Sequence, residues 1–316
     1  MLRKKIVITL LIISSITCGN TFAVDYGPQF ESVWAWKITT QKRTVYLLGE
    51  LHNFGGESLN LSHKLGGEIY NISKEIWTEN SQINSGNYQI TDFLKPETIS
   101  QVRSSLKKTI NQTSNKSEQE KIELLAKVME DFDKSDPITA HNTLMMISSL
   151  KIFKKNPTYK SYAGFINTMR KQLDNSQSKL KDIESATAVE DTWLQNCQQK
   201  NKAEEMIQLG LEKLNLEADS LSTFFNETIE AFAKKNNELS QITDFFSKSK
   251  DAVLMNECSI VPRNKNWLPK ILNSLSTQGP PVAFVVGIAH IGGTSGLISL
   301  LKKEGYPNIE RVRTTD

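Results

Sequence analysis

The chain has 316 residues, enough for one large domain or two smaller ones. Its 38 basic and 35 acidic residues give a formal net charge of +3, and three of the bases stand among the first five residues. A charge this close to balance gives no electrostatic reason to expect nucleic acid or an anionic membrane surface as a partner.

The N-terminus has the pattern of a secretory signal peptide. Three basic residues at 3–5 precede an apolar run at 6–13, and the small residues Thr21 and Ala23 stand three and one positions before the expected cleavage point. The run is too short to cross a bilayer, which takes about 20 residues. Removal of residues 1–23 takes away three bases and no acid, which leaves 35 of each. We therefore expect an exported protein, periplasmic or secreted, with no transmembrane anchor.

Two cysteines remain after the signal peptide, Cys197 and Cys258. In an oxidising compartment an even pair is expected to form a disulfide. On the chain-entropy model, closing a loop of this length would stabilise the fold by about 4 kcal/mol. Two free buried thiols are the alternative. A zinc site is disfavoured because neither cysteine has a second cysteine or a histidine at ligand spacing.

The first part of the mature chain reads as strand, strand, helix and strand. The β-rich runs at 33–38 and 44–49 flank a polar turn at 41–43 and predict a hairpin. Apolar residues at helical spacing predict a helix within 59–73. The alternating residues 75–79 predict a third strand.

The last part of the chain has the same character. Residues 263–276 have one apolar helical face, and a Gly-Pro-Pro break follows. The continuous apolar run at 282–289 is typical of a strand buried on both faces of a mainly parallel sheet. A helix is expected at 297–304, ended by Gly305, and a final edge strand at 308–312.

The middle of the chain, residues 81–257, is polar, poor in glycine and helical in period. Its aromatic and methionine stripes are expected to form core rather than cofactor contacts. We therefore predict a single domain over 24–316 of α/β class. Its mixed, mainly parallel sheet is built from 28–80 and 258–316, and 81–257 is a long helical insertion.

Two of the four histidines follow strand-like runs and precede glycine loops. His52 stands in Gly49-Glu50-Leu51-His52-Asn53, and His290 stands in Gly287-Ile288-Ala289-His290 before Gly292. Ligands of open α/β sheets bind beyond the carboxyl ends of strands, and Glu79 ends the third predicted strand. Two imidazoles and a carboxylate suit a transition metal with open positions. Alternatively each is a hydrogen-bonded or solvated residue without function, as we expect for His63 and His141.

Segments at both ends of the chain share their order and spacing with a known family. The N-terminal segments are Val33-Trp34-Ala35-Trp36, Tyr46-Leu47-Leu48-Gly49-Glu50-Leu51-His52 and Glu79. The C-terminal segments are Arg263-Asn264, Phe284-Val285-Val286-Gly287-Ile288-Ala289-His290-Ile291-Gly292-Gly293, Gly296-Leu297, Leu300-Leu301 and Gly305-Tyr306. In these segments the chain resembles the TraB/GumN family, whereas the middle resembles it only in helical character.

The resemblance implies an α/β fold shared with the Tiki metalloproteases, which are similar in their G-x-x-H, Glu and second His elements. It implies His52, Glu79 and His290 as ligands of a divalent metal ion of the Mn, Co or Zn class. Arg263 and Asn264 would line the same cleft, with Asn53 beside His52. The group also includes a peptide-pheromone inhibitor, and a more distant group binds haem.

One position departs from the family. The residue after Gly49 is usually a small hydroxyl residue, and here it is Glu50. Residues i and i+2 of a strand point to the same face, so Glu50 and His52 are expected to project together. Glu50 would then be an extra ligand or a general base acting on a metal-bound water, or it would form a salt bridge to Arg263 and disable the chemistry.

The leading hypothesis is a divalent-metal-dependent hydrolase of peptide bonds, acting on a peptide or small-molecule substrate. Glu50 or Glu79 would handle the proton, and Arg263 would steady an oxyanion or a substrate carboxylate. The alternative is a non-catalytic binding or inhibitor module that sequesters a peptide or haem in the same cleft. A third hypothesis is a purely structural envelope protein.

Overall fold

The computed structural model describes residues 30–31, 33–51, 54–57, 61–79, 89–114, 116–156, 159–162, 164–172, 179–185, 200–223 and 250–313, with the single residues 188, 192, 196 and 226. The predicted signal peptide and the predicted site residues His52 and Asn53 lie outside this part of the chain, as does Cys197.

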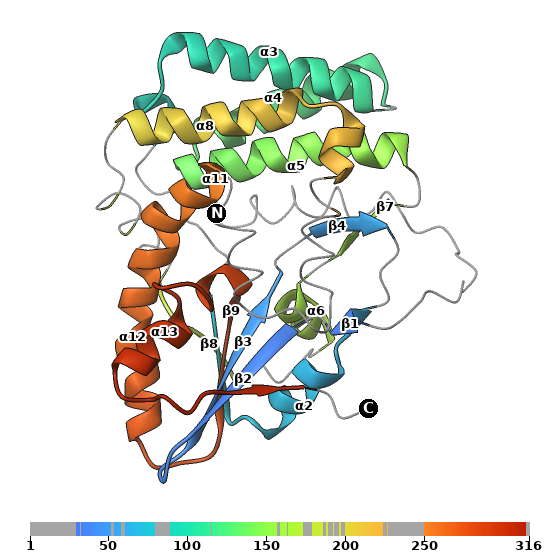
Figure 1. The fold of residues 1–316 in the computed structure, drawn as a ribbon. Coiled ribbons are helices and arrows are strands. Elements are labelled where there is room, and N and C mark those ends of the chain that lie inside the picture. The colour runs from blue at the N-terminus through green and yellow to red at the C-terminus, as the bar shows by residue number, and fades with distance from the viewer. Residues whose placement is uncertain are drawn as a thin grey trace, which may run out of the picture.

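A six-stranded sheet forms the lower half of the molecule in Figure 1. Its spatial order is β10 (Glu310–Val312), β2 (Val33–Thr39), β3 (Thr44–Glu50), β9 (Val282–Gly287), β6 (Glu75–Thr78) and β8 (Leu180–Asp182). The strands β3, β9, β6 and β8 run parallel to one another, whereas β2 is antiparallel to both β3 and β10.

The mixed character of the predicted sheet is confirmed, whereas its description as mainly parallel and as made only from the two ends of the chain needs correction. The sheet is mixed, because the short turn between β2 and β3 forces them to run antiparallel and β10 pairs antiparallel with β2. Residues 81–257 are also not wholly helical. They contain β8, which extends the main sheet, and β7 (Tyr159–Tyr162), which pairs with β4 (Phe54–Glu57).

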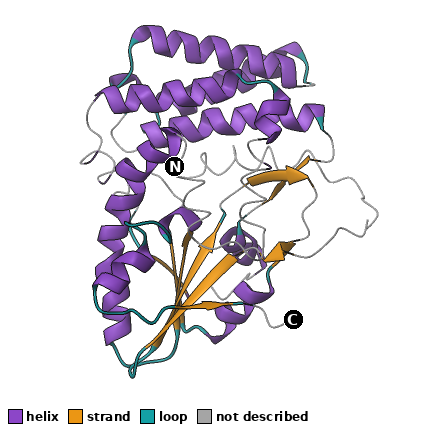
Figure 2. Ribbon diagram, in the orientation of Figure 1, coloured by secondary structure: helices purple, strands orange, loops and turns teal. Residues whose placement is uncertain are grey.

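Both faces of the sheet are covered by helices (Figure 2). On one face α12 (Val261–Ser276) and α13 (Leu297–Lys303) pack against Phe284 and Val286 of β9. On the other face α2 (Lys64–Ile72) and α6 (Phe165–Gln172) pack against Ala283 and Val285. Successive strand residues point to opposite faces, so burial on both sides accounts for the unbroken apolar sequence of β9.

A layer of helices lies above the sheet in Figure 1. It contains α3 (Pro96–Thr113), α4 (Glu118–Asp133), α5 (Pro137–Lys155) and α8 (Lys200–Asn215), preceded by a 3-10 turn at Ile90–Asp92. These helices share a core that is separate from the two sheet cores and is formed by side chains such as Leu106, Phe132, Leu144 and Ile207. The short strands β1 (Phe30–Glu31) and β5 (Leu61–Ser62) pair in parallel, and β1 lies near α2 in the lower half of Figure 1.

One long helical element connects the helical layer with the sheet. It consists of α11 (Lys250–Met255), a π-helical turn (Asn256–Ile260) and α12. Pro262 lacks an N–H and cannot donate to the carbonyl four residues earlier, which favours a local change of helical hydrogen bonding before it. In keeping with this, the Val261 N–H donates to the carbonyl of Asn256. Arg263 and Asn264 follow immediately, and both are buried.

Among the helices of the described residues, none has the length and apolar character that crossing a membrane requires.

Candidate functional site

The parallel pairing of β6 with β9 brings the first two site segments together. Thr78 is paired with Val285, so Glu79 lies beside the end of β9. The carboxylate oxygen Oε1 of Glu79 accepts a hydrogen bond from the backbone N–H of Gly287. Beyond Gly287 the chain makes a 3-10 turn over Ile288–His290, and this turn carries the His290 imidazole next to Glu79. The distance from His290 Nε2 to Glu79 Oε1 is 3.7 Å.

Gly49 allows this turn to pack closely against β3. A Cβ atom on Gly49 would overlap Cδ1 of Ile288 and lie 3.1 Å from Cγ1 of Ile291. Its backbone does not have a positive φ, so the need for glycine here comes from close approach and not from conformation. The glycine of the N-terminal G-x-x-H segment thus positions the turn that carries the C-terminal histidine.

Asn264 of α12 sets the orientation of the His290 ring. Its Nδ2 donates hydrogen bonds to the backbone carbonyls of His290, at 3.1 Å, and Ser295, at 3.0 Å. Its Oδ1 therefore faces His290 Nδ1 at 2.8 Å and acts as an acceptor. His290 must then carry a proton on Nδ1, which in the neutral ring leaves the lone pair of Nε2 facing Glu79. Trp267, one turn further along α12, packs its ring against His290 with the centroids 4.5 Å apart.

Arg263 is held between two carboxylates. Its Nη2 donates to Glu79 Oε2 at 3.1 Å and also to Glu184, while its Nε donates to both oxygens of Glu184 at 3.1 Å. Burial by itself would lower the pKa of Arg263, but the charges and hydrogen bonds of Glu79 and Glu184 outweigh it and raise the pKa. The guanidinium is therefore permanently charged. Within the described residues its third nitrogen, Nη1, makes no hydrogen bond.

Glu184 is a site residue that the sequence analysis missed. It follows the three-residue strand β8, whose burial pattern is too short and too polar to be recognised from periodicity. Its side chain is nonetheless only 6% exposed, and it also accepts a hydrogen bond from Trp267 Nε1 at 2.8 Å. A sequence signal that could have found it is the apolar Ile183 beside the acid, which is buried in the sheet core.

Glu50 ends β3 and is buried, with 4% of its surface exposed. Its Oε2 accepts a hydrogen bond from the backbone N–H of Ile166 at 3.0 Å, at the first turn of α6. Arg263 has its carboxylate partners, within the described residues, in Glu79 and Glu184. Within the described residues Glu50 forms no ion pair with Arg263, so the hypothesis of a disabling salt bridge is wrong, whereas Glu50 as a ligand or as a general base stays a prediction.

The structure describes only some of the remaining residues that the sequence singled out, the cysteine pair and the other histidines. Cys258 is fully buried, but Cys197 lies outside the described residues and their disulfide stays a prediction. His141 is buried in the helical layer, where its Nδ1 lies 3.0 Å from the carbonyl of Met206. Among the residues that the structure describes, no three His, Cys, Asp or Glu side chains are grouped to hold a metal ion, and His52 is not among those residues.

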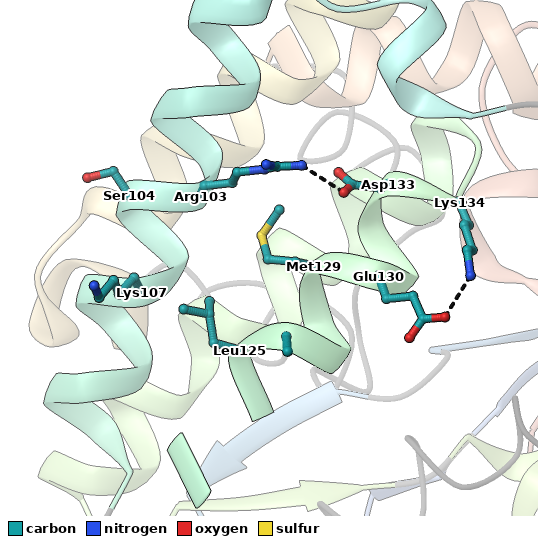
Figure 3. Close-up of a pocket in the computed structure, with 9 residues that line it drawn as sticks. Arg103, Ser104, Lys107, Leu125, Met129, Glu130, Asp133 and Lys134 are labelled. Atoms are coloured by element: carbon teal, nitrogen blue, oxygen red, sulfur yellow. Dashed lines mark hydrogen bonds and ion pairs between the residues drawn. The ribbon is translucent and has the colours of Figure 1, made fainter. Parts of the chain in front are cut away.

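A separate groove lies between α3 and α4 in the helical layer (Figure 3). Leu125 and Met129 provide its apolar lining, and an ion pair of 2.9 Å between Arg103 and Asp133 spans from one helix to the other. The groove shares no residue with the cluster around Glu79 and His290.

Among curated proteins and among solved structures, neither comparison gave a match. The family model of the TraB/PrgY/gumN family matches residues 34–308, which include Glu79, Glu184, Arg263, Asn264 and His290. The chain therefore belongs to the TraB/PrgY/gumN family.

Proposed function

We propose that this protein is an exported, divalent-metal-dependent hydrolase that acts on peptide bonds, with its site at the carboxyl ends of β3, β9 and β6. Export is supported by the N-terminal sequence pattern. The hydrolytic function is supported by one observation above all, the arrangement of His290 between Asn264 and Glu79.

The residues present fit a metal ion. The Asn264 amide holds the His290 proton on Nδ1, so Nε2 presents its lone pair toward the Glu79 carboxylate 3.7 Å away. Two electron pairs facing each other in a buried site repel, and a proton or a cation between them relieves the repulsion. Two ligand atoms that share a tetrahedral ion at about 2.1 Å are about 3.4 Å apart, so the pair needs only a small adjustment.

The strand order supports His52 as a third ligand. β9 lies between β6, which precedes Glu79, and β3, which precedes His52 by two residues. Because β3, β9 and β6 are parallel, their carboxyl ends open at the same edge of the sheet. His52, Glu79 and His290 would hold the metal ion, which would be of the Mn, Co or Zn class.

A metal ion held there would supply a nucleophilic water at neutral pH and polarise the scissile carbonyl. The Glu79 carboxylate, already an acceptor for Gly287 and Arg263, would orient the site, and Glu50 or Glu79 would receive the proton. Arg263 would present Nη1 to a developing oxyanion, since its Nε and Nη2 are engaged by Glu184 and Glu79.

The test measures bound metal and peptide hydrolysis for the mature wild type and for His52→Ala and His290→Ala. Bound Mn, Co and Zn would be quantified after loading, and turnover followed with a library of quenched fluorescent peptides. We expect both variants to lose metal and turnover, while His141→Gln, which removes a buried histidine in the helical layer, keeps both. If the wild type retains no metal and hydrolyses no peptide, the proposal is wrong.

The same proteins, assayed with a peptide, a chelator and haem, distinguish the hydrolase from the non-catalytic binding module. A binding module would retain a peptide without turnover and would be indifferent to a chelator. A haem-binding module would show a Soret band on haem addition that is lost in His52→Ala.

A further inference from the structure

Glu184 contacts Arg263 and Trp267, the two side chains of α12 that lie next to the proposed metal ligands. β8 pairs in parallel with β6, so Glu184 follows β8 at the same end of the sheet at which Glu79 follows β6. The two carboxylates come from segments more than a hundred positions apart, and the strand pairing brings both to Arg263 of α12. Each contacts the same guanidinium, that of Arg263.

The carboxylate of Glu184 has a full set of donors. Oε1 accepts from Nε and Nη2 of Arg263, and Oε2 accepts from Nε of Arg263 and from the indole N–H of Trp267. Arg263 and Trp267 are four residues apart on α12 and therefore lie on one face of the helix. The guanidinium carbon also lies 4.7 Å from the centre of the Trp267 ring. One buried carboxylate thus orients two large side chains at once.

Each of these two side chains orients a proposed metal ligand. Arg263 donates to Glu79 Oε2 at 3.1 Å, which leaves Oε1 on the side of Gly287 and His290. Trp267 packs its ring against the His290 imidazole, with the two ring planes at 37°. Without the Glu184 carboxylate, Arg263 would keep only Glu79 of its two buried carboxylate acceptors and the Trp267 indole N–H would lose its acceptor, so both side chains would be less firmly held.

We infer that Glu184 is a positioning residue, which fixes the Glu79 carboxylate through Arg263 and the His290 imidazole through Trp267. Its effect on metal affinity rests on the proposed function, whereas its effect on the orientation of His290 and Trp267 does not. A merely structural ion pair with Arg263 would contribute to folding stability and leave the two ligand side chains unchanged.

The experiment compares Glu184→Gln with Glu75→Gln in the mature protein. Glu75 lies on the neighbouring strand β6 in a half-exposed ion pair with Lys181 at 2.5 Å, so its variant controls for the loss of one carboxylate near β8. Side-chain NMR follows the indole N–H of Trp267, identified with Trp267→Phe, and the ring nitrogens of His290, identified with His290→Gln. Co²⁺ binding is titrated in parallel.

In Glu184→Gln we expect an upfield shift of the Trp267 indole proton, changed His290 ring nitrogen shifts, and about a 10- to 100-fold weaker binding of Co²⁺, as for losses of outer-sphere partners. Glu75→Gln should change none of these. Trp267→Phe keeps an aromatic ring at this position but removes the indole donor to Glu184, so it should also change the His290 signals, and it decides the question if Glu184→Gln does not fold. The inference is overturned if both site variants fold and the His290 signals match the wild type. If the wild type binds no Co²⁺, Mn²⁺ or Zn²⁺, the proposed function fails, and the NMR result still decides the role of Glu184.

Discussion

Asn264 makes two hydrogen bonds with His290. The amide nitrogen of Asn264 donates to the backbone carbonyl of His290 at 3.1 Å, and the amide oxygen of Asn264 lies 2.8 Å from the ring nitrogen Nδ1 of His290. A further bond to the carbonyl of Ser295 removes the freedom of the amide to turn over. The tautomer of His290 is therefore determined by a residue of a different element, α12, and this relationship carries the proposal of a metal site.

The first prediction concerns Asn264→Ala. Loss of the amide leaves two carbonyls and the His290 N–H without their partner in a buried region, and we expect the free energy of unfolding to fall by about 3 kcal/mol. Denaturant unfolding measures this loss, and NMR of the His290 ring should show a mixture of tautomers. Asn273→Ala, at an exposed position of the same helix, should stay within about 0.5 kcal/mol of the wild type. A single Nδ1-protonated tautomer in Asn264→Ala would contradict the role given to the amide.

The second prediction concerns the packing of Gly49. A Cβ atom would overlap Cδ1 of Ile288, so Gly49→Ala should lower the free energy of unfolding by about 1–3 kcal/mol. Ile288→Val removes Cδ1 and should restore part of the loss, which a double-mutant cycle measures. Gly67→Ala is the matched control, because a Cβ there meets nothing within 4 Å and the position is helical. It should stabilise by about 0.5–1 kcal/mol. Strictly additive effects of the two site changes would rule out the close contact.

The third prediction concerns the charge of Arg263. Arg263→Met leaves the carboxylates of Glu79 and Glu184 without the guanidinium between them, and breaking a buried ion pair from one side costs about 3–5 kcal/mol. Arg263→Lys keeps the charge but cannot reproduce the planar fork, so it should fall between the wild type and the methionine variant. Urea unfolding of the three proteins gives the order. Equal stability of the lysine and methionine variants would mean that the charge is unimportant here.

The fourth prediction is a pH dependence due to His63. Partial burial lowers the pKa of His63 below its ordinary value of 6.5, and the charge of Glu50 opposes this only in part. The unfolded chain then takes up a proton near pH 6.5 that the folded protein does not yet bind, so stability is present above pH 6.5 and declines as the pH falls through the interval below it. The thermal stability of His63→Gln should decline less than that of the wild type between about pH 7.5 and 5.5, the range in which histidines titrate. Thermal unfolding at a series of pH values measures this difference. An identical decline in both proteins would exclude His63 as its cause.

The fifth prediction concerns the pairing of Cys197 with Cys258. We expect no reactive thiol in the unfolded mature protein before reduction and two after it, as a thiol titration in denaturant would show. Cys197→Ser and Cys258→Ser should each lose up to about 4 kcal/mol, with no further loss in the double variant. Two reactive thiols in the unreduced protein would favour the alternative of free buried cysteines.

The strands and helices that position Glu79 and His290 could be predicted from the sequence because their signals are local. The apolar run of β9 ends at Gly287, the alternating run of β6 ends before Glu79, and the apolar face of α12 includes Trp267 and Ile271. Each of these patterns is a periodicity of apolar and polar residues within one short segment. It can therefore be recognised in the sequence without knowledge of the partner strand. The resemblance to the family, which segments at both ends of the chain carry, is confirmed by the family match over residues 34–308.

Only the tertiary structure decided the position of Glu184 at the site and the place of β8 at the edge of the sheet. β8 is three residues long, and its place beside β6 depends on pairing with a strand a hundred positions away, for which no local pattern codes. A hydrogen-bond partner of Glu50 is likewise a backbone N–H of α6, far along the chain. The sequence by itself therefore determined which residues end buried strands at the site. Only the folded chain decided which two carboxylates hold Arg263, because these contacts join segments far apart in the sequence and no local pattern indicates them.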